Sequence, residues 1–392
     1  MKPYSLASST WGPEEIEAIQ ECIKSGRFTM GSEVEAYESE FAAHVGAKFA
    51  VMVNSGSSAN LALMAAARYR NKPLLEPGFE VIVPAVSWST TYYPVNQNGG
   101  ILKFVDIDGA TLNIDIAKTE EAITKQTKAI FAVNLLGNPA EWDSLKLLAT
   151  THNLILFEDN CESLGAKIEG KSTGTFGVGG TYSSFFSHHI STMEGGMVVT
   201  DDEPLFHTLK SIRAHGWTRD LPSQNHVYNK TGTPWEDLFR FVLPGYNLRP
   251  LEIEAAIGRV QLKRLDSFVY TRRKNAEIFK SHLEAIPEYR TQLEFGESSW
   301  FGFSIVLQGK LKNSRSELIK VLDEAAIETR PIITGNFTRN PVIKHMTFAP
   351  MEKMPVADEI HDHGFFVGNH HFDLSEEIER LAEVLTTFLR RF

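Results

Sequence analysis

Between residues 45 and 200, short apolar runs alternate with stretches of helical pattern, and this alternation limits the possible folds more than any other feature. Several of the runs are continuously apolar, which is typical of strands buried on both faces of a sheet. Such strands joined by helices, for example at residues 59–69 and 119–124, indicate an α/β fold with a mostly parallel sheet. The seven predicted strands lie at residues 50–53, 81–84, 102–106, 129–134, 154–158, 182–186 and 197–200.

The pattern changes near residue 251. Long amphipathic helices are predicted at 252–265 and 271–285, then a strand at 300–307 and helices at 316–325 and 376–389. This order indicates a smaller α+β domain. We therefore predict two domains, a large one over residues 1–250 and a small one over 251–392, which together account for the 392 residues. The polar, turn-rich segment 219–235 is predicted to be an exposed loop.

Charge and cysteine content exclude several kinds of protein. The chain carries 49 acidic and 39 basic residues, a net charge of -10, which argues against general binding to nucleic acid or to an anionic membrane. Cys22 and Cys161 cannot supply the four thiolates of an iron–sulfur or structural zinc site. The chain has no uncharged apolar stretch of about 18 residues and no signal-peptide pattern in its first 30 residues. We expect a soluble cytoplasmic protein.

Gly56 and Ser57 lie in a turn of small residues between a predicted strand and a predicted helix. The free backbone amides of a helix N-terminus, together with serine hydroxyls, can bind a phosphate group. Gly56 allows the backbone to come close to such a group. The same turn is equally consistent with an ordinary helix cap, so this segment alone does not decide between the two.

Two further candidates follow predicted strands. Asp159 lies at the end of the strand predicted at 154–158, and ligands in open α/β sheets bind at the carboxyl ends of strands. A carboxylate there can hold a protonated ring nitrogen or a metal, although a carboxylate that caps the next turn is the commoner arrangement. Trp88 follows the strand predicted at 81–84, and its ring can stack on a planar cofactor or pack in the core.

The segment 181–196 is polar, follows a strand and contains two adjacent histidines, His188 and His189. Neighbouring histidines in a strand point to opposite faces and so do not easily hold one metal ion. One of them can act as a general acid or base, because histidine titrates near neutral pH. A histidine hydrogen-bonded within a loop is an equally good explanation of either one alone.

Together these segments are more specific than any one of them. Their order is a Ser-Gly-Ser turn, an aromatic residue, an aspartate at a strand end and a Ser…His loop before Gly195 and Gly196. Over essentially the whole chain, this order resembles the fold-type I enzymes that use pyridoxal phosphate, in the sugar aminotransferase branch. In that branch, a lysine seven positions before the Gly-Gly pair forms a Schiff base with the cofactor. This chain has His188 at that position, and no lysine occurs between Lys171 and Lys210.

The chain resembles in particular the 3-dehydratases that act on GDP-linked 4-keto-6-deoxy sugars for O-antigen synthesis. The strings that carry this resemblance are SHHISTMEGG, VPAVSWSTTYYP, NLLGNP, RAHGWTRDLP, FVLPGYN and ESSWFGFS. A second subgroup with the same histidine makes CDP-linked dideoxy sugars and needs an iron–sulfur cluster, for which the cysteines here do not suffice. The resemblance therefore implies non-covalently bound pyridoxal or pyridoxamine phosphate and no cluster. The implied substrates are GDP-4-keto-6-deoxy-D-mannose, which would lose its C3 hydroxyl, and L-glutamate, which would restore the amine form as ammonia is released.

The resemblance also implies roles for individual residues. His188 is expected to take the C4′ proton of the cofactor and to protonate the departing hydroxyl. Asp159 is expected to pair with the pyridinium nitrogen, Glu162 to lie near the ring hydroxyl and Trp88 to stack on the ring. The cofactor phosphate is expected to contact Gly56, Ser57, Ser183 and, across the interface of a homodimer, Asn247. Further candidates for sugar or diphosphate contact, each equally consistent with an ordinary salt bridge or hydrogen bond, are Ser187, His215, Arg219, Glu328 and Arg330.

Other functions stay open on the sequence alone. They are an aminotransferase that uses another lysine, a 3-dehydratase of a related GDP-heptose, and a non-catalytic ligand sensor that kept the fold. A metal hydrolase is a more distant alternative, suggested by the histidines near the C-terminus. These histidines lack a motif such as HExxH, and those at 361 and 363 are predicted to lie in a loop, so we predict no metal site. They are His361, His363, His370 and His371.

Overall fold

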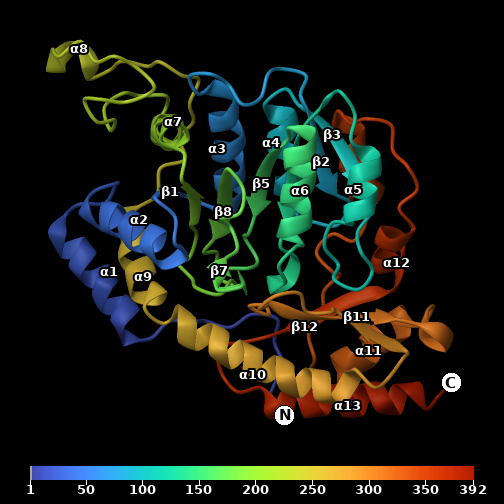
Figure 1. The fold of residues 1–392 in the computed structure, drawn as a ribbon. Coiled ribbons are helices and arrows are strands. Elements are labelled where there is room, and N and C mark those ends of the chain that lie inside the picture. The colour runs from blue at the N-terminus through green and yellow to red at the C-terminus, as the bar shows by residue number, and fades with distance from the viewer. Residues whose placement is uncertain (1) are drawn as a thin grey trace.

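A seven-stranded sheet forms the centre of the computed structural model, which describes residues 2–392 (Figure 1). Its strands are β1 (Phe49–Val53), β2 (Glu80–Pro84), β3 (Ile101–Val105), β4 (Thr127–Val133), β5 (Ile155–Asp159), β8 (Gly179–Ser183) and β9 (Gly196–Thr200). The spatial order is β1-β9-β8-β5-β4-β2-β3. The neighbours from β8 to β3 are paired in parallel, and β9 runs antiparallel to both β1 and β8. The predicted mostly parallel sheet is confirmed, as is each of its strands within a few residues.

Helices cover both faces of this sheet. One face is covered by α3 (Gly56–Tyr69), α4 (Ser89–Gln97) and α7 (Glu203–Arg213). The other face is covered by α2 (Ser32–Val45), α5 (Ile116–Ala122), α6 (Trp142–His152) and α9 (Glu252–Leu262). Along β2, for example, Val81 and Val83 belong to the first core and Ile82 to the second, because side chains alternate across a strand. The sheet is thus the middle of three layers, which explains why its strands are continuously apolar.

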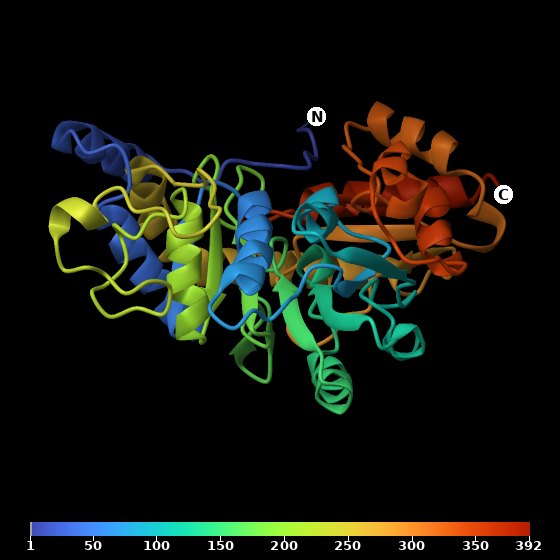
Figure 2. The ribbon, with the colours of Figure 1, turned by 90° about the horizontal axis from the view of Figure 1, so that it is seen from above.

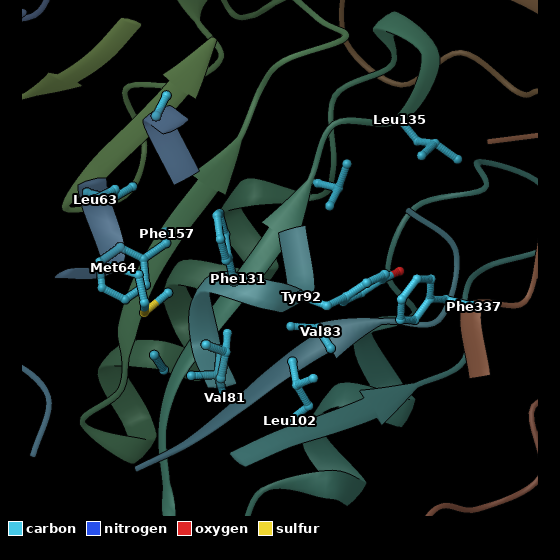
Figure 3. Packing of buried hydrophobic residues seen from close by; sticks show 14 of the residues in the cluster. Leu63, Met64, Val81, Val83, Tyr92, Leu102, Phe131, Leu135, Phe157 and Phe337 are labelled. Carbon is cyan, nitrogen blue, oxygen red and sulfur yellow. The ribbon is translucent and has the colours of Figure 1, made fainter. Parts of the chain in front are cut away.

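The core between α3 and the sheet is tightly packed (Figure 3). Leu63 and Met64 of α3 lie over Phe157 of β5 and Phe131 of β4, and the rings of those two phenylalanines meet edge to face at 6.0 Å. Helix α3 carries small residues along most of its length, which lets it approach the strands closely. This packing fixes the N-terminus of α3 at the carboxyl end of the sheet.

A smaller unit follows toward the C-terminus. Its antiparallel sheet has the order β10-β11-β12, with β10 (Tyr289–Thr291), β11 (Gly302–Leu307) and β12 (Gly364–Gly368). Three helices share a core with this sheet, namely α10 (Leu265–Leu283), α11 (Arg315–Glu324) and α13 (Ser375–Leu389). Helix α10 runs obliquely below the large sheet in Figure 1 and connects the two units.

The packing suggests a domain division that differs from a break at residue 251. Helix α9 lies against α1 (Pro13–Ser25) and α2, and the start of α10 still packs in a core with β1 and β9. At the other end of the chain, Tyr4 is buried in the core of the smaller unit, where it pairs with Ile327. The N-terminal residues accordingly lie beside the C-terminal unit (Figure 2). We propose that the domains divide within α10 and that the first residues belong to the small domain.

The remaining elements are short or peripheral. They are the strands β6 (Lys167–Ile168) and β7 (Lys171–Ser172), the helices α8 (Pro234–Asp237) and α12 (Pro355–His363), and the 3-10 turns η1 (Leu135–Gly137), η2 (Gly309–Leu311), η3 (Phe337–Arg339) and η4 (Pro341–His345). The expectation of a loop at 361–363 is wrong, because these residues form the last turn of α12. Within residues 2–392, no helix is both long and apolar enough to cross a membrane.

Candidate active site

A cavity of about 410 Å³ lies at the carboxyl ends of the central strands. Val133, Asp159 and Ser183, the last residues of β4, β5 and β8, form part of its wall, where ligands of open α/β sheets bind. Arg330 and Phe366 reach it from the small domain. The cavity brings together most of the side chains that the sequence singled out, namely Gly56, Ser57, Trp88, Asp159, Glu162, Ser183, Ser187, His188 and Arg330.

The turn before α3 forms one end of the cavity. Ser55 caps the helix, and its Oγ accepts a hydrogen bond from the backbone N–H of Ser58 at 3.1 Å. A Cβ on Gly56 would lie only 2.6 Å from the Cβ of Ser183, so glycine is needed for this turn to meet β8. The Ser57 hydroxyl donates to Thr90 Oγ1 at 3.0 Å. Hydroxyls and free helix amides therefore meet here, an arrangement suited to a phosphate group.

Asp159 is buried and held by three donors. Its Oδ2 accepts hydrogen bonds from Asn60 Nδ2 at 2.8 Å and Thr91 Oγ1 at 2.7 Å. Its Oδ1 accepts from the backbone N–H of Cys161 at 3.2 Å. Asn60 and Thr91 come from α3 and α4, so two helices and a strand fix the carboxylate at the cavity wall. No motif in the sequence marks either partner: Asn60 lies inside the helix predicted at 59–69, and Thr91 lies in α4, for which no helix is predicted.

Glu162 stands three residues further along and has a different environment. Its Oε2 accepts a hydrogen bond from the backbone N–H of Leu136 at 3.1 Å. Burial raises the pKa of Glu162 to about 8, and the nearby Asp159 carboxylate contributes to that rise. Glu162 is therefore mainly protonated at neutral pH, and its carboxyl group can donate a hydrogen bond into the cavity.

Trp88 precedes α4, and its ring is 56% exposed at the side of the cavity. A large apolar ring left this open in a cavity wall is available to stack on a planar ligand. The interpretation of Trp88 as a core residue is therefore wrong, whereas its predicted stacking role stays a prediction.

His188 lies in the loop after β8 and lines the cavity. Burial, with a smaller contribution from the Arg272 guanidinium, lowers the pKa of His188 to about 4. The ring is thus neutral near pH 7 and can accept a proton. Its Nδ1 is buried, so Nε2 is the ring nitrogen left to face the cavity.

His189 does not share this site. It is fully buried, and its Nε2 makes a hydrogen bond with the carbonyl oxygen of Ser299 at 3.0 Å. The two adjacent histidines are therefore separated, with one in the cavity and the other in the interior, although they lie in a loop and not in a strand.

Four predicted residues lie outside the cavity. Glu328 accepts a hydrogen bond from the backbone N–H of Leu6 at 2.8 Å and so holds the N-terminal segment. His215, Arg219 and Asn247 lie in the segment between α7 and α9. The Arg219 guanidinium stacks 4.4 Å from the Trp217 ring, and the rings of His215 and Trp217 meet at 5.0 Å. Asn247 is exposed, and its Oδ1 accepts from Arg249 Nε at 3.0 Å. The roles of these residues stay predictions.

Several cavity residues gave no usable signal in the sequence. Glu194 precedes the Gly-Gly pair, and Phe301 and Ile333 come from loops whose position depends on the small domain. Only the packing of the two domains brings Phe301 and Ile333 to the cavity wall. The others that line the cavity are Ser55, Asn60, Ser87, Thr90, Val133, Cys161, Phe185, Pro331 and Phe366.

Two of the histidines near the C-terminus, His370 and His371, make structural contacts. His370 Nδ1 makes a hydrogen bond with Ser8 Oγ at 2.9 Å, and its Nε2 makes one with the carbonyl oxygen of Ser5 at 2.8 Å. His371 packs on the Phe268 ring at 4.8 Å. In the part of the chain that the structure describes, no three His, Cys, Asp or Glu side chains are arranged to hold a metal ion.

Comparison with known proteins identifies the family. The sequence pattern of the DegT/DnrJ/EryC1/StrS aminotransferase family matches residues 10–386. The chain belongs to this family. Its fold is accordingly the fold-type I arrangement of the pyridoxal phosphate enzymes, as predicted.

Two relatives within the DegT/DnrJ/EryC1/StrS family share one name. GDP-4-keto-6-deoxy-D-mannose 3-dehydratase from Yersinia pseudotuberculosis is 54% identical over 97% of this chain and 98% of its own length. The protein of that name from Escherichia coli O55:H7 is 52% identical over 97% and 99%. A crystal structure of GDP-4-keto-6-deoxymannose-3-dehydratase with a trapped PLP-glutamate geminal diamine superposes with a TM-score of 0.96, at 52% identity, over 97% of this chain and all of that one.

The cavity fits the cofactor of this family, pyridoxal or pyridoxamine phosphate. The α3 turn suits its phosphate, the Asp159 carboxylate suits a protonated ring nitrogen, and Trp88 offers a face to its ring. No lysine is among the cavity residues contributed by residues 2–392, so the side chains present suit non-covalent binding.

Proposed function

We propose that this enzyme removes the C3 hydroxyl of GDP-4-keto-6-deoxy-D-mannose and yields the 3,6-dideoxy-4-keto sugar. The observation that carries the proposal is His188, which occupies the place of the family's lysine in a cavity that otherwise suits the cofactor. Relatives with this named activity that are more than half identical over nearly the whole chain support it.

Pyridoxamine phosphate, when bound, supplies an amine that condenses with the C4 ketone and a conjugated ring that accepts an electron pair. Asp159 holds the ring nitrogen, since its own orientation is fixed by Asn60, Thr91 and the Cys161 amide. Gly56, Ser57 and Ser183 hold the phosphate. The neutral carboxyl of Glu162 donates to the ring hydroxyl oxygen, where an ionised carboxylate would repel it.

His188 moves the protons. Its neutral Nε2 accepts the proton from the C4′ carbon that joins the amine to the ring. The resulting imidazolium is a strong acid, because the buried position favours the neutral form, and it gives the proton to the departing C3 oxygen. A lysine at this position would instead capture the cofactor, whereas an imidazole is a base that forms no such bond.

The overall reaction balances with glutamate as the reductant. The sugar loses its C3 oxygen as water, and a water molecule supplies the carbonyl oxygen when glutamate becomes 2-oxoglutarate. Ammonia is released, and the reaction consumes no water overall. We propose that Arg330 receives an anionic group of a substrate, because it is exposed at the cavity and forms no ion pair with any of residues 2–392. Ser187, beside His188, is within the same cavity wall and is proposed to contact the sugar.

We also propose that the working form is a homodimer in the cytoplasm, where nucleotide sugars and glutamate are supplied. Helix α1 and the turn after it expose Ile16, Ile23 and Phe28 by 47%, 55% and 59%. Large apolar side chains exposed in this way are typical of a subunit interface. Asn247, which is exposed outside its own cavity, is proposed to complete the site of the neighbouring subunit.

The proposal is tested by incubating the enzyme with pyridoxal phosphate, glutamate and GDP-4-keto-6-deoxy-D-mannose. We expect 2-oxoglutarate, ammonia and a GDP-sugar lighter by one oxygen to form in equal amounts. Accumulation of a GDP-linked amino sugar would instead show an aminotransferase, and the absence of any deoxy product would contradict the proposal.

A further inference from the structure

The imidazole of His188 has no hydrogen-bonding partner that would orient it. Its Nδ1 is buried, and within residues 2–392 no donor or acceptor lies within hydrogen-bond distance of that atom. A histidine that works as a base is usually held by a carboxylate or carbonyl on the ring nitrogen that faces away from the substrate. Something else must therefore hold this ring.

Two phenylalanine rings contact the imidazole instead. The Phe301 ring lies 5.2 Å from it, centroid to centroid, at an angle of 66°. The Phe185 ring lies 6.0 Å from it at 82°. Both are edge-to-face contacts, the arrangement that aromatic rings prefer. They come from different parts of the fold, since Phe185 belongs to the loop of His188 itself and Phe301 directly precedes β11.

Phe301 is fixed on both sides through its backbone. Its N–H donates to the Leu136 carbonyl oxygen at 3.0 Å, and its carbonyl oxygen accepts from Arg272 Nη1 at 3.2 Å. Arg272 is buried, with 3% exposure, and also donates to the Asn369 carbonyl oxygen at 2.6 Å. The preceding residue, Trp300, has a φ of 49°, an unfavourable conformation for a bulky side chain that the surrounding contacts must maintain.

We propose that Phe301 is a positioning residue of the reaction, which together with Phe185 holds the His188 ring by aromatic packing with Nε2 toward the cavity. This inference rests on the proposed role of His188 as the base. Arg272 and Leu136 then act indirectly on the geometry of the reaction, because they fix the backbone of Phe301, which in turn holds the His188 ring.

The same surroundings account for the protonation state of His188. The charged and titratable groups on its buried side are Arg272 and His189, and those that share its cavity are Asp159, Glu162, Glu194 and Arg330. Aromatic neighbours keep water from the ring without stabilising its cation by a hydrogen bond, in line with the lowered pKa of His188.

The test compares Phe301→Leu, which removes the ring, with Phe301→Tyr, which retains it. In Phe301→Leu, we expect kcat for deoxysugar formation to fall by roughly tenfold to a hundredfold with little change in the KM for the GDP-sugar. Phe301→Tyr should recover most of that loss. A crystal structure of cofactor-bound Phe301→Leu should show the His188 ring in more than one rotamer.

Phe279→Leu is the matched control. Phe279 is a buried phenylalanine of the small domain that stacks on Phe303 at 4.3 Å and lies outside the cavity, so its replacement should lower stability but leave kcat unchanged. The positioning role of Phe301 is wrong if Phe301→Leu keeps wild-type kcat, if Phe301→Tyr loses as much as Phe301→Leu, or if the His188 rotamer stays single in Phe301→Leu. The rotamer can be read even if wild-type enzyme proves not to dehydrate this sugar, so failure of the proposed function is distinguishable.

Discussion

Two acid–base groups of the cavity, His188 and Glu162, are neutral near pH 7, although burial shifts their pKa values in opposite directions. Enclosure lowers the pKa of His188 to about 4, because the charged form of a histidine is the cation, and raises that of Glu162 to about 8, because the charged form of a carboxyl is the anion. The site therefore offers one proton acceptor and one hydrogen-bond donor that add no charge to it. Each of these neutral states results from the burial of one side chain.

His188→Lys is expected to convert non-covalent cofactor binding into a covalent bond between the new amine and the cofactor. Dehydration should fall by roughly 10²–10⁴-fold, the usual contribution of a general acid–base residue. Borohydride reduction followed by peptide mass analysis should find the cofactor attached at position 188 in the variant and unattached in wild type. A variant that dehydrates normally would contradict the role given to His188.

Glu162→Gln is expected to be more stable than wild type at alkaline pH. The pKa of Glu162 is raised from its ordinary value of 4.5 to about 8 on folding, so between these values the folded protein keeps a proton that the unfolded chain releases. That contribution is present below pH 4.5 and is lost as pH rises through about 8. Glutamine carries no such proton. The stability gain of the variant should therefore grow from pH 5 to pH 8, to roughly 3–4 kcal/mol.

Thermal unfolding at several pH values measures this difference. Glu120→Gln, at an exposed position of α5, is the control and should show a pH-independent difference from wild type. If the stability difference between Glu162→Gln and wild type does not change across this pH range, Glu162 is ionised in the folded protein.

At the scale of elements, the site depends on how closely α3 meets the ends of β5 and β8. Small residues at the N-terminus of α3 bring its free amides next to Ser183, and the cap by Ser55 leaves the turn rigid. The helix also contributes Asn60, which orients Asp159 one turn further on. A single helix thus contributes to both ends of the cavity, the end proposed for the cofactor phosphate and the end proposed for its ring.

Gly56→Ala tests this packing. The added Cβ would lie 2.6 Å from Ser183 Cβ and 3.0 Å from Cys161 Sγ, so α3 must move away from the strands. We expect a loss of about 1–3 kcal/mol in stability and weaker cofactor binding, measured by thermal unfolding and by absorbance titration with pyridoxal phosphate. Gly109→Ala is the control, because its Cβ meets no atom closer than 3.4 Å. Equal behaviour of the two variants would refute the argument.

For the whole molecule, contacts within one chain leave much of the apolar surface of the segment between α7 and α9 uncovered. It exposes Trp235, Phe239 and Phe241 by 84%, 67% and 55% and carries Asn247 outside the cavity. An enzyme that exposes this much apolar surface near its site is expected to cover it in an oligomer. The proposed homodimer would place this segment at the neighbouring subunit's cavity.

Mixing two inactive variants tests the shared site. His188→Asn and Asn247→Ala, each expected to be nearly inactive alone, should regain up to about a quarter of wild-type activity when unfolded and refolded together, since half the dimers are hybrids and each has one intact site. Activity of the mixture no higher than that of the separate variants would mean that Asn247 serves its own subunit or has no role in the site.

The sequence predicted the large sheet well because both faces of its strands are covered, so each strand is marked by an apolar run of its own. The strand predicted at 182–186 is the exception, since it ends at Ser183. Phe185 and Phe186 are apolar but exposed, and a run of apolar letters does not distinguish a buried strand from a loop that lines a cavity or an interface. The same ambiguity makes the domain boundary hard to place, because α9 and α10 have the same amphipathic pattern. Helix α9 and the start of α10 share the core of the large unit, whereas the later part of α10 packs in the core of the small unit.

For the site, the local motifs indicate the available chemistry: a histidine in the loop after a strand, an aspartate at a strand end, and a turn that suits a phosphate group. These signals are local, because each motif joins a strand end to the residues that follow it. Only the tertiary structure decided which histidine faces the cavity, what holds Asp159, and that Phe301 and Arg330 join the site from the small domain. Those contacts join residues far apart in the sequence, such as Asn60 with Asp159 and His189 with Ser299. Burial and distance, which set the charge of Glu162 and the orientation of His188, exist only once the chain has folded.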